Sequence, residues 1–301
     1  MIDGKLGGIK QGGFAPRIII NGIFILLSLC CVVPLLLIVS ASFSTEEGIN
    51  LRGYSLLPRD FSFQAYKFIL RNPRQLFYSY VVTIFVTAAG TLGSLLCTSM
   101  LAYVIARRDF PLRRLFSFLV LFTLLFSGGL VPSYIMVSRY YHLKDTFLAL
   151  VLPYIIIPWH VFLMKGFFTD MPTSLIEAAK IDGAREVTIF FKIIAPVSKP
   201  AFATIGLFCA FTYWNDWWLS LLYINNPRLI SLQFYLYRIM NTIQFLATSM
   251  ASRSVIIDMR DLPGETARMA LCVLAAGPML FIFPFFQKYF VKGITLGAVK
   301  E

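Results

Sequence analysis

Charged residues are scarce in this sequence, and their scarcity excludes an ordinary soluble domain. Only 14% of the 301 residues are Asp, Glu, Lys or Arg, whereas soluble domains contain about 25%. Hydrophobic residues make up 58% of the chain, and the mean hydropathy is +0.74. We therefore expect most of the chain to lie in lipid.

Metal-binding and nucleotide-binding patterns are also lacking. The two histidines, His142 and His160, are eighteen residues apart, and no CxxC pair occurs. These absences argue against a zinc site, a disulfide framework and an intramembrane enzyme. No G-x-x-x-x-G-K-[ST] run is present, so we expect no nucleotide site in this chain. The five cysteines are expected to be small, buried, apolar residues: Cys30, Cys31, Cys97, Cys209 and Cys272.

Six stretches of the chain contain no charged residue, or only one, and each is long enough to cross a bilayer. A crossing helix needs about 20 apolar residues. Helices are expected because lipid offers the backbone no hydrogen-bond partner, and the alternating pattern of a membrane barrel is absent. The predicted fold class is an all-α integral membrane protein with six transmembrane helices. The stretches are 18–45, 75–106, 115–138, 146–164, 200–227 (interrupted by Asp216) and 269–287.

The positive charges predict which side of the membrane each loop faces. Loop 107–114 contains four arginines, and the positive-inside rule places such a short loop in the cytoplasm. The tails 1–17 and 288–301 and the loop 165–199 then share that side. The predicted cytoplasmic segments contain 15 basic residues, and the predicted outer segments contain 12. Because this difference is small, the assignment of sides rests mainly on loop 107–114. The first apolar run is too long for a signal peptide and is expected to be retained.

The predicted outer segments contain more than turns. We divide the chain into 18–74, with the first helix and an outer interfacial segment, and a core, 75–287, that contains loops 165–199 and 225–268. Ser62 is expected to cap a short interfacial helix on which Phe63, Tyr66 and Leu70 share a face. Loop 225–268 is too charged for lipid and too large for a connector, which indicates a docking role.

Loop 165–199 has the pattern of two short helices. Pro172 suits an early helical position, and Ser174 with Glu177 three residues later has the spacing of a capping box. Gly183 permits a tight turn or bend, and apolar residues resume at helical spacing until Pro196. These local residue patterns are also consistent with an amphipathic hairpin of two helices that is simply exposed to solvent and has no binding role.

A longer pattern in this loop is similar to the EAA loop of ABC-importer permeases. The match is Glu177-Ala178-Ala179, then Gly183, Ile193, Ala195 and Pro196 at the family spacing, with Ala195 in place of the usual Leu. Other segments resemble carbohydrate importers of the maltose-permease type. These segments are Leu57-Pro58, Ala102-Tyr103 with Ala106-Arg107, Phe110-Pro111, Gly128 to Tyr134, and Tyr213 to Trp218; the last two resemble the branch that imports complex oligosaccharides.

The resemblance implies a type I importer permease fold with a coupling helix between the fourth and fifth spans. It implies that Glu177 faces a basic residue of an ATPase, that Ala178 and Ala179 allow a close seat, and that Gly183 makes the bend. ATP and Mg would be bound by the partner, with no cofactor in this chain. The implied partners are a second, homologous permease, two cytoplasmic ATPase subunits, an extracytoplasmic solute-binding protein, membrane lipid and an oligosaccharide, with no nucleic acid. The implied location is a bacterial cell membrane, with both termini cytoplasmic.

The aromatic and polar residues around Asp216 are candidates for the substrate path. Sixteen residues separate Pro200 from Asp216, a rise of about 24 Å, which places this acid near the outer edge of the bilayer. It is either an interfacial Asp among belt tryptophans or part of a sugar-contacting cluster. The candidate residues are Tyr134, Tyr213, Trp214, Asn215, Asp216 and Trp217.

Four further alternatives stay open from the sequence. Gly128 and Gly129 allow either close helix packing or a break at a gate, and His160 is either a packing residue or a proton relay. The outer segments hold 12 basic and 7 acidic residues, which suits either an acidic oligosaccharide or an acidic partner or headgroup. An ion-coupled secondary transporter is the alternative function, although neither repeated halves nor buried coupling charges are visible.

Overall fold

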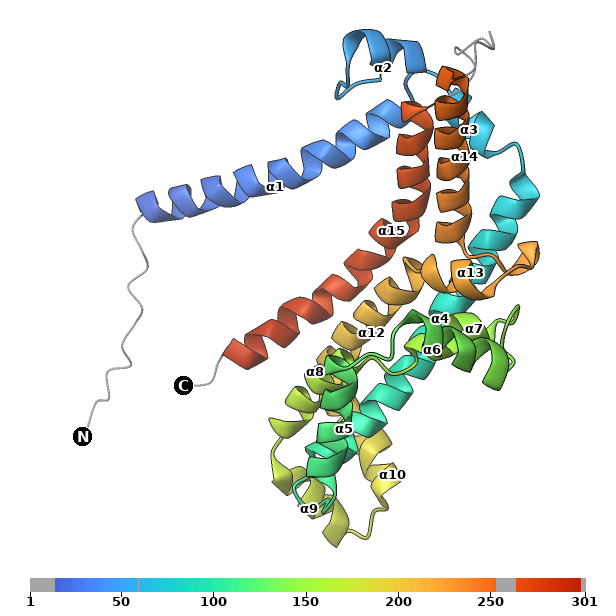
Figure 1. Cartoon of the computed structure of the whole chain (residues 1–301). Coiled ribbons are helices and arrows are strands. Elements are labelled where there is room, and N and C mark those ends of the chain that lie inside the picture. The colour runs from blue at the N-terminus through green and yellow to red at the C-terminus, as the bar shows by residue number, and fades with distance from the viewer. Residues whose placement is uncertain (1–13, 59, 253–263, 299–301) are drawn as a thin grey trace. The chain divides into compact units, whose positions relative to one another are not determined.

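The computed structural model describes residues 14–58, 60–252 and 264–298, and every regular element in these ranges is helical (Figure 1). The chain forms two compact units, Met1–Ile69 with Ala247–Val273, and Leu70–Leu246 with Leu274–Glu301. Two long helices, α14 (Leu232–Ser252) and α15 (Glu265–Ala298), contribute residues to both.

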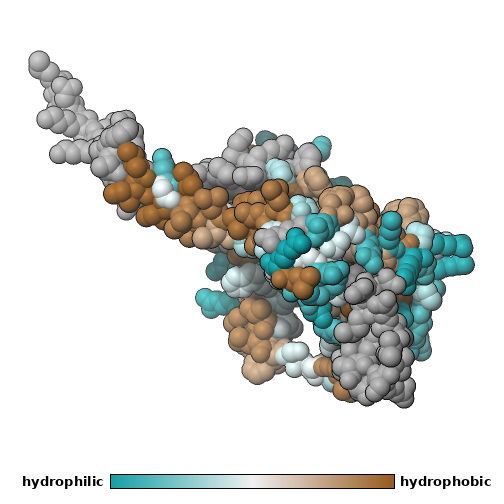
Figure 2. Space-filling model, turned by 90° about the horizontal axis from the view of Figure 1, so that it is seen from above, coloured by the Kyte–Doolittle hydropathy of each residue, from teal (hydrophilic) through white to brown (hydrophobic). Residues whose placement is uncertain are grey.

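The first unit contains α1 (Phe14–Ser42), α2 (Glu46–Arg52) and α3 (Gln64–Ile69). Hydrophobic side chains cover α1 (Figure 2), and none of its most apolar window is buried within the chain. The predicted cap of α3 is confirmed, since the Ser62 hydroxyl accepts a hydrogen bond from Gln64 N at 3.1 Å. The expected shared face is only partly present, because α3 buries Ala65 and Ile69 and leaves Phe63 exposed.

The start of α15 is capped from a distance by Glu46. One Glu46 carboxylate oxygen accepts from Glu265 N at 2.8 Å, and the other accepts from Thr266 N at 3.0 Å and from the Thr266 hydroxyl at 2.8 Å. A carboxylate is favourable at this position because the amides of the first helical turn are unpaired and carry partial positive charge. Both partners lie in the first unit, so this contact holds that unit together.

Within the described residues, six candidate spans are present when each bent helix pair is counted as one. Three single helices are long and apolar enough to cross a membrane, Ile18–Ser42, Pro73–Ala106 and Glu265–Ile282. The other three spans are helix pairs bent by 110°, 52° and 86°: Arg113–Leu125 with Leu130–Tyr140, Leu148–Tyr154 with Pro158–Thr169, and Glu186–Val197 with Lys199–Trp214. The first bend falls at Gly129, whose φ of +84° favours glycine. Gly128 and Gly129 therefore mark a break.

The second unit is built around α4 (Pro73–Ala106), with α8 (Pro158–Thr169) and α12 (Lys199–Trp214) packed against it. Close packing is possible because Gly90 of α4 lies under the Tyr213 ring, where a Cβ atom would be 2.5 Å from Tyr213 Cζ. The Tyr213 hydroxyl donates to Val151 O at 2.8 Å. The remaining elements of this unit are α5 (Arg113–Leu125), α6 (Leu130–Ile135), η1 (Met136–Tyr140), α7 (Leu148–Val151), η2 (Leu152–Tyr154), α9 (Thr173–Ile181), α10 (Glu186–Ile189), η3 (Phe190–Ile194), α11 (Ala195–Val197), α13 (Trp218–Tyr223) and η4 (Pro227–Leu229).

Two aromatic side chains hold α15 next to its internal proline. Pro278 has no N–H, so the carbonyl of Leu274, four residues earlier, loses its helical partner. The Tyr80 hydroxyl donates to that carbonyl at 2.9 Å, and Trp214 Nε1 donates to the neighbouring Ala275 O at 3.0 Å. These bonds satisfy backbone groups that lipid would leave unpaired.

The expectation that all cysteines are buried is wrong. Cys30, Cys31 and Cys272 are exposed on the isolated chain, because they lie on helix faces that this chain leaves uncovered. Cys209 is buried, with its sulfur 3.3 Å from the Ser94 hydroxyl and 3.5 Å from His160 Nδ1. His160 also stacks on Phe208, which is the environment of a packing residue.

Candidate functional site

Two short helices form the exposed part of loop 165–199, at the end of α4 (Figure 1). The first is α9, and the second begins as α10 and continues through η3 and α11 to Val197. Pro196 is exposed near the end of the second helix, and the chain bends there before α12 begins at Lys199. The predicted pair of helices is therefore present.

Gly183 makes the turn between them. Its φ is +77°, in the left-handed region that favours glycine. Gly183 N donates to Lys180 O at 3.0 Å, and Ala184 N donates to Ala179 O at 3.0 Å. These two bonds are those of a Schellman motif, which satisfies the last carbonyls of α9 and reverses the chain. The predicted bend at Gly183 is confirmed.

The predicted capping box at the start of α9 is wrong. Pro172, with φ −59° and ψ 127°, occupies the extended capping position, and α9 begins at Thr173. Ser174 is therefore already inside the first turn and cannot cap it. No side chain caps this helix among the described residues.

The two helices are packed very differently. Within the second helix Ile189, Phe190 and Ile194 are almost fully buried against α4, α8 and α12. Along α9 only Ala179 is buried, while Glu177 and Ala178 are exposed and Ile181 is 87% exposed. Apolar burial thus fixes the second helix firmly to the unit, whereas α9 is held by the small Ala179 and the partly buried Ile176.

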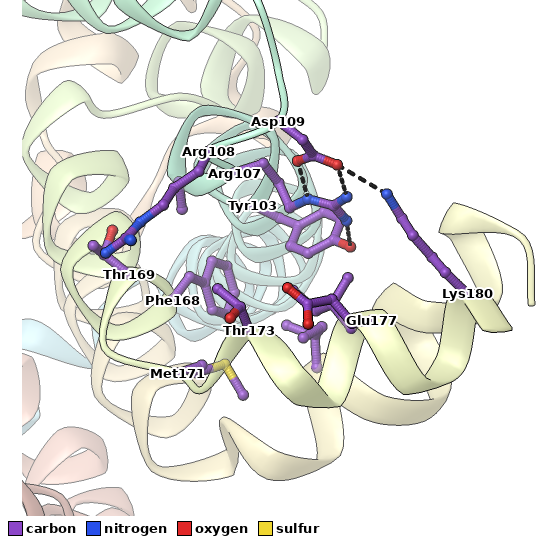
Figure 3. A pocket seen from close by; sticks show the side chains of 13 residues that line it. Tyr103, Arg107, Arg108, Asp109, Phe168, Thr169, Met171, Thr173, Glu177 and Lys180 are labelled. Carbon is purple, nitrogen blue, oxygen red and sulfur yellow. Dashed lines mark hydrogen bonds and ion pairs between the residues drawn. The ribbon is translucent and has the colours of Figure 1, made fainter.

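A network of charges connects α9 and α10 to the end of α4. Arg107 donates to Glu186 Oε2 at 2.8 Å, to the Tyr103 hydroxyl at 2.7 Å and to both carboxylate oxygens of Asp109. Lys180 donates to Asp109 Oδ2 at 2.8 Å (Figure 3). It also lies 3.4 Å from Glu186 Oε1. Asp109 is thereby shared between two cations from segments far apart in the sequence.

The network keeps its members ionised. Hydrogen bonds from Arg107, and then from Lys180, hold the pKa of Asp109 well below its usual range. The hydrogen bond to Asp109 raises the pKa of Lys180. These directions preserve the ion pairs throughout the neutral pH range.

A cavity of ≈ 510 Å³ lies beside the network (Figure 3). Its lining combines apolar side chains, including Phe168, Met171 and Ile176, with charged ones. Glu177 and Arg108 are exposed members of the lining, and neither forms a hydrogen bond or ion pair with the residues that the structure describes. They remain available to a partner of opposite charge.

The candidate substrate-path residues do not form one exposed cluster. Tyr213 and Trp214 are 1% and 3% exposed and donate to backbone carbonyls, whereas Asn215 is exposed. Asp216 lies just beyond α12 and accepts from Leu219 N at 3.2 Å in the first turn of α13. Both the interfacial role and the path role of Asp216 stay predictions.

The last two candidates pack in aromatic pairs. The Trp217 ring stacks on Tyr237 with centroids 4.7 Å apart, and Tyr134 stacks on Tyr223 with centroids 5.8 Å apart. Both pairs border the cluster of buried residues around Tyr213 and Leu219. A path role for these rings also stays a prediction.

Comparisons with known proteins cover nearly the whole chain. The family described as "Binding-protein-dependent transport system inner membrane component" matches residues 11–296. The polygalacturonan/rhamnogalacturonan transport system permease protein YtcP of Bacillus subtilis is 38% identical, over 94% of this chain and 97% of that protein. The arabinooligosaccharides transport system permease protein AraQ of Bacillus subtilis is 27% identical, over 94% and 96%.

A solved structure is also similar. The match is to a chain in the crystal structure of a bacterial ABC transporter involved in the import of the acidic polysaccharide alginate. The TM-score is 0.76 at 29% sequence identity, over 92% of this chain and 98% of that chain. The likeness therefore extends through the loop and the spans together.

Proposed function

This chain belongs to the family of binding-protein-dependent transport system inner membrane components, and from that membership we propose that it carries acidic oligosaccharides. It is a permease subunit of an ABC importer and has the type I importer fold, as the sequence predicts. The names of its relatives include polygalacturonan and alginate, and both polymers are built of uronic acids. The excess of basic residues in the predicted outer segments, 12 against 7 acidic residues, suits such a cargo.

The two helices around Gly183 form the proposed coupling site for a separate ATPase. The observation that carries this proposal is the exposed, unpaired carboxylate of Glu177 on a helix that is shallowly packed. Ala178 beside it is exposed and small, so a partner surface can approach the helix closely. The buried second helix then transmits the movement to α4, α8 and α12.

The proposed assembly contains two ATPase subunits that bind ATP and Mg, a second permease and a solute-binding protein. The exposed apolar residues of α1 and α5 suit lipid or the second permease. Both termini lie in the cytoplasm in this proposal, because the arginine-rich loop 107–114 is on that side.

Reconstitution of the whole complex tests the coupling site. Glu177→Ala is expected to leave assembly intact and to reduce ATP-driven uptake and the stimulation of ATP hydrolysis by loaded binding protein. Asp182→Asn is the matched control, since it removes an exposed carboxylate at the end of α9 that has no bond to the described residues. Normal uptake by Glu177→Ala would contradict the assignment.

The same vesicles test the cargo and the energy source. Uptake is measured with galacturonate oligomers and with neutral oligomers of equal length. Equal uptake of both would remove the acidic class. Uptake driven by an ion gradient without ATP would instead favour the secondary-transporter alternative.

A further inference from the structure

The position of α9 depends on very few contacts. Its single buried side chain is Ala179, and its C-terminal turn at Gly183 connects it to the fixed second helix. Its polar side-chain attachments among the described residues are the ion pairs of Lys180, to Asp109 at 2.8 Å and to Glu186 at 3.4 Å, and Ile176 packs partly buried against the cluster below. Without Lys180, α9 would be held by its connections to α8 and to the second helix, by Ala179 and by the partly buried Ile176.

The ion pairs join α9 to a membrane helix and not merely to a neighbouring loop. Asp109 receives Lys180 on one side and Arg107 on the other, and Arg107 caps the end of α4. The Arg107 side chain is only 11% exposed, and its guanidinium lies over the Tyr103 ring at 5.5 Å. Arg107 is thus firmly placed, whereas Asp109 and Lys180 are 54% and 42% exposed.

This arrangement differs from an ordinary surface ion pair. Isolated exposed pairs contribute little to stability, because water and salt screen them and their long side chains lose freedom. Here one carboxylate, that of Asp109, connects the nearby Arg107 with Lys180, which is 71 residues away from Asp109, and Arg107 is held by further bonds. The main effect of removing the carboxylate is therefore on where α9 lies and not on whether the unit folds.

We infer that Asp109 is a positioning residue that, through Lys180 and Arg107, makes α9 move together with the end of α4. The inference rests on the proposed coupling function of α9. When the ATPase pulls on α9, the carboxylate transmits that force directly to α4, in parallel with the longer route through Gly183 and the second helix. Removing the carboxylate lets α9 pivot about Gly183, so part of each ATP-driven movement is lost before it reaches the membrane.

Transport per ATP in the reconstituted complex tests this inference. Asp109→Asn is expected to lower the number of substrate molecules imported per ATP hydrolysed by at least about twofold, the lower range for substitutions that alter coupling between sites. Asp109→Glu keeps the charge and is expected to restore most of the ratio. Glu47→Gln, which removes an exposed carboxylate of α2 in the first unit, is the control and is expected to keep the wild-type ratio. An unchanged ratio in Asp109→Asn would overturn the inference.

A distance measurement separates positioning from a general loss of stability. Spin labels at Ile181 of α9 and Val104 of α4, in a complex without other reactive cysteines, should give a narrow distance distribution in the parent and in Asp109→Glu. The distribution should broaden in Asp109→Asn, while the midpoint of thermal unfolding stays the same. A narrow distribution in Asp109→Asn, or a lowered midpoint that Asp109→Glu does not restore, would refute the positioning role.

The parent complex distinguishes this inference from the proposed function. If the parent shows no ATP-driven uptake, the proposed function fails. If the parent transports and Asp109→Asn transports with the same ratio, only the positioning role fails.

Discussion

Replacing Gly183 by alanine should loosen the turn between α9 and α10 by a predictable amount. The backbone φ of +77° places an L-residue in the left-handed region, which costs about 1–2 kcal/mol. A Cβ at Gly183 would meet no atom within 4 Å, so no steric term adds to this cost. Local opening of the turn should therefore become about 5- to 30-fold more frequent.

Hydrogen exchange provides the assay. The amides of Gly183 and Ala184 donate to Lys180 O and Ala179 O, and each must open before it exchanges. Exchange in a peptide covering residues 173–189 is measured by mass spectrometry on the purified complex. The Gly183→Ala peptide should exchange faster, and ATP-driven uptake should fall because the two helices no longer keep one angle.

Two control variants make the reasoning refutable. Gly183→Asn should lie between glycine and alanine, because asparagine tolerates the left-handed region better than alanine. Gly166→Ala, inside α8 with no atom within 4 Å of its Cβ, should be neutral or stabilising by up to about 1 kcal/mol. Equal exchange in Gly183→Ala and the parent, or equal effects of Ala and Asn at this position, would show that the turn's geometry does not control its stability.

Two further predictions concern packing between the spans, each measured as the midpoint of thermal unfolding in detergent. Tyr80→Phe should destabilise the protein by about 1–3 kcal/mol, because the Leu274 carbonyl next to Pro278 loses its donor; Tyr78→Phe, which removes an exposed hydroxyl, is the control, and equal midpoints would contradict the prediction. Gly90→Ala should cost about 1–3 kcal/mol or more, because the added methyl would lie 2.5 Å from the Tyr213 ring. Gly22→Ala has open space around its Cβ and should be tolerated, so full tolerance of Gly90→Ala as well would refute the close approach.

The spans could be predicted because lipid penalises every charge. All six charge-poor stretches correspond to a helix or a bent helix pair within the described residues. The break at Gly129 was also indicated by residue type, since glycine permits a positive φ. The second bend lies before Pro158, which lacks an N–H. Their angles of 110° and 52° depend on packing against other helices, which local residue types do not encode.

The coupling site was only partly predictable. The Gly183 turn follows from a local conformational requirement, and so does the helix on each side of it. The Ser174 cap failed because Pro172 already occupies the extended position before the helix. The network was missed, although Arg107, Asp109 and the charges of loop 165–199 had been placed on one side of the membrane; their pairing across 71 residues or more appears only in the folded chain.

The aromatic cluster shows a different limit of sequence reasoning. Tyr213, Trp214 and Trp217 were grouped because they are consecutive or nearly so and chemically suited to sugars. In the structure the first two are inserted between helices and only Asn215 is freely exposed. Adjacent residues of a helix point in different directions, so composition alone could not separate the packing residues from the accessible ones.

The hydrogen bonds donated by Tyr80, Trp214 and Tyr213 affect which sequence changes this protein can tolerate. Each aromatic side chain donates to a main-chain carbonyl, of Leu274, Ala275 and Val151 respectively. Every amino acid presents that carbonyl, so the acceptor positions can accept other apolar side chains without losing the bond. Only the aromatic donors must be kept to preserve these bonds. The side chains at the acceptor positions can therefore change to suit a different lipid, partner or cargo.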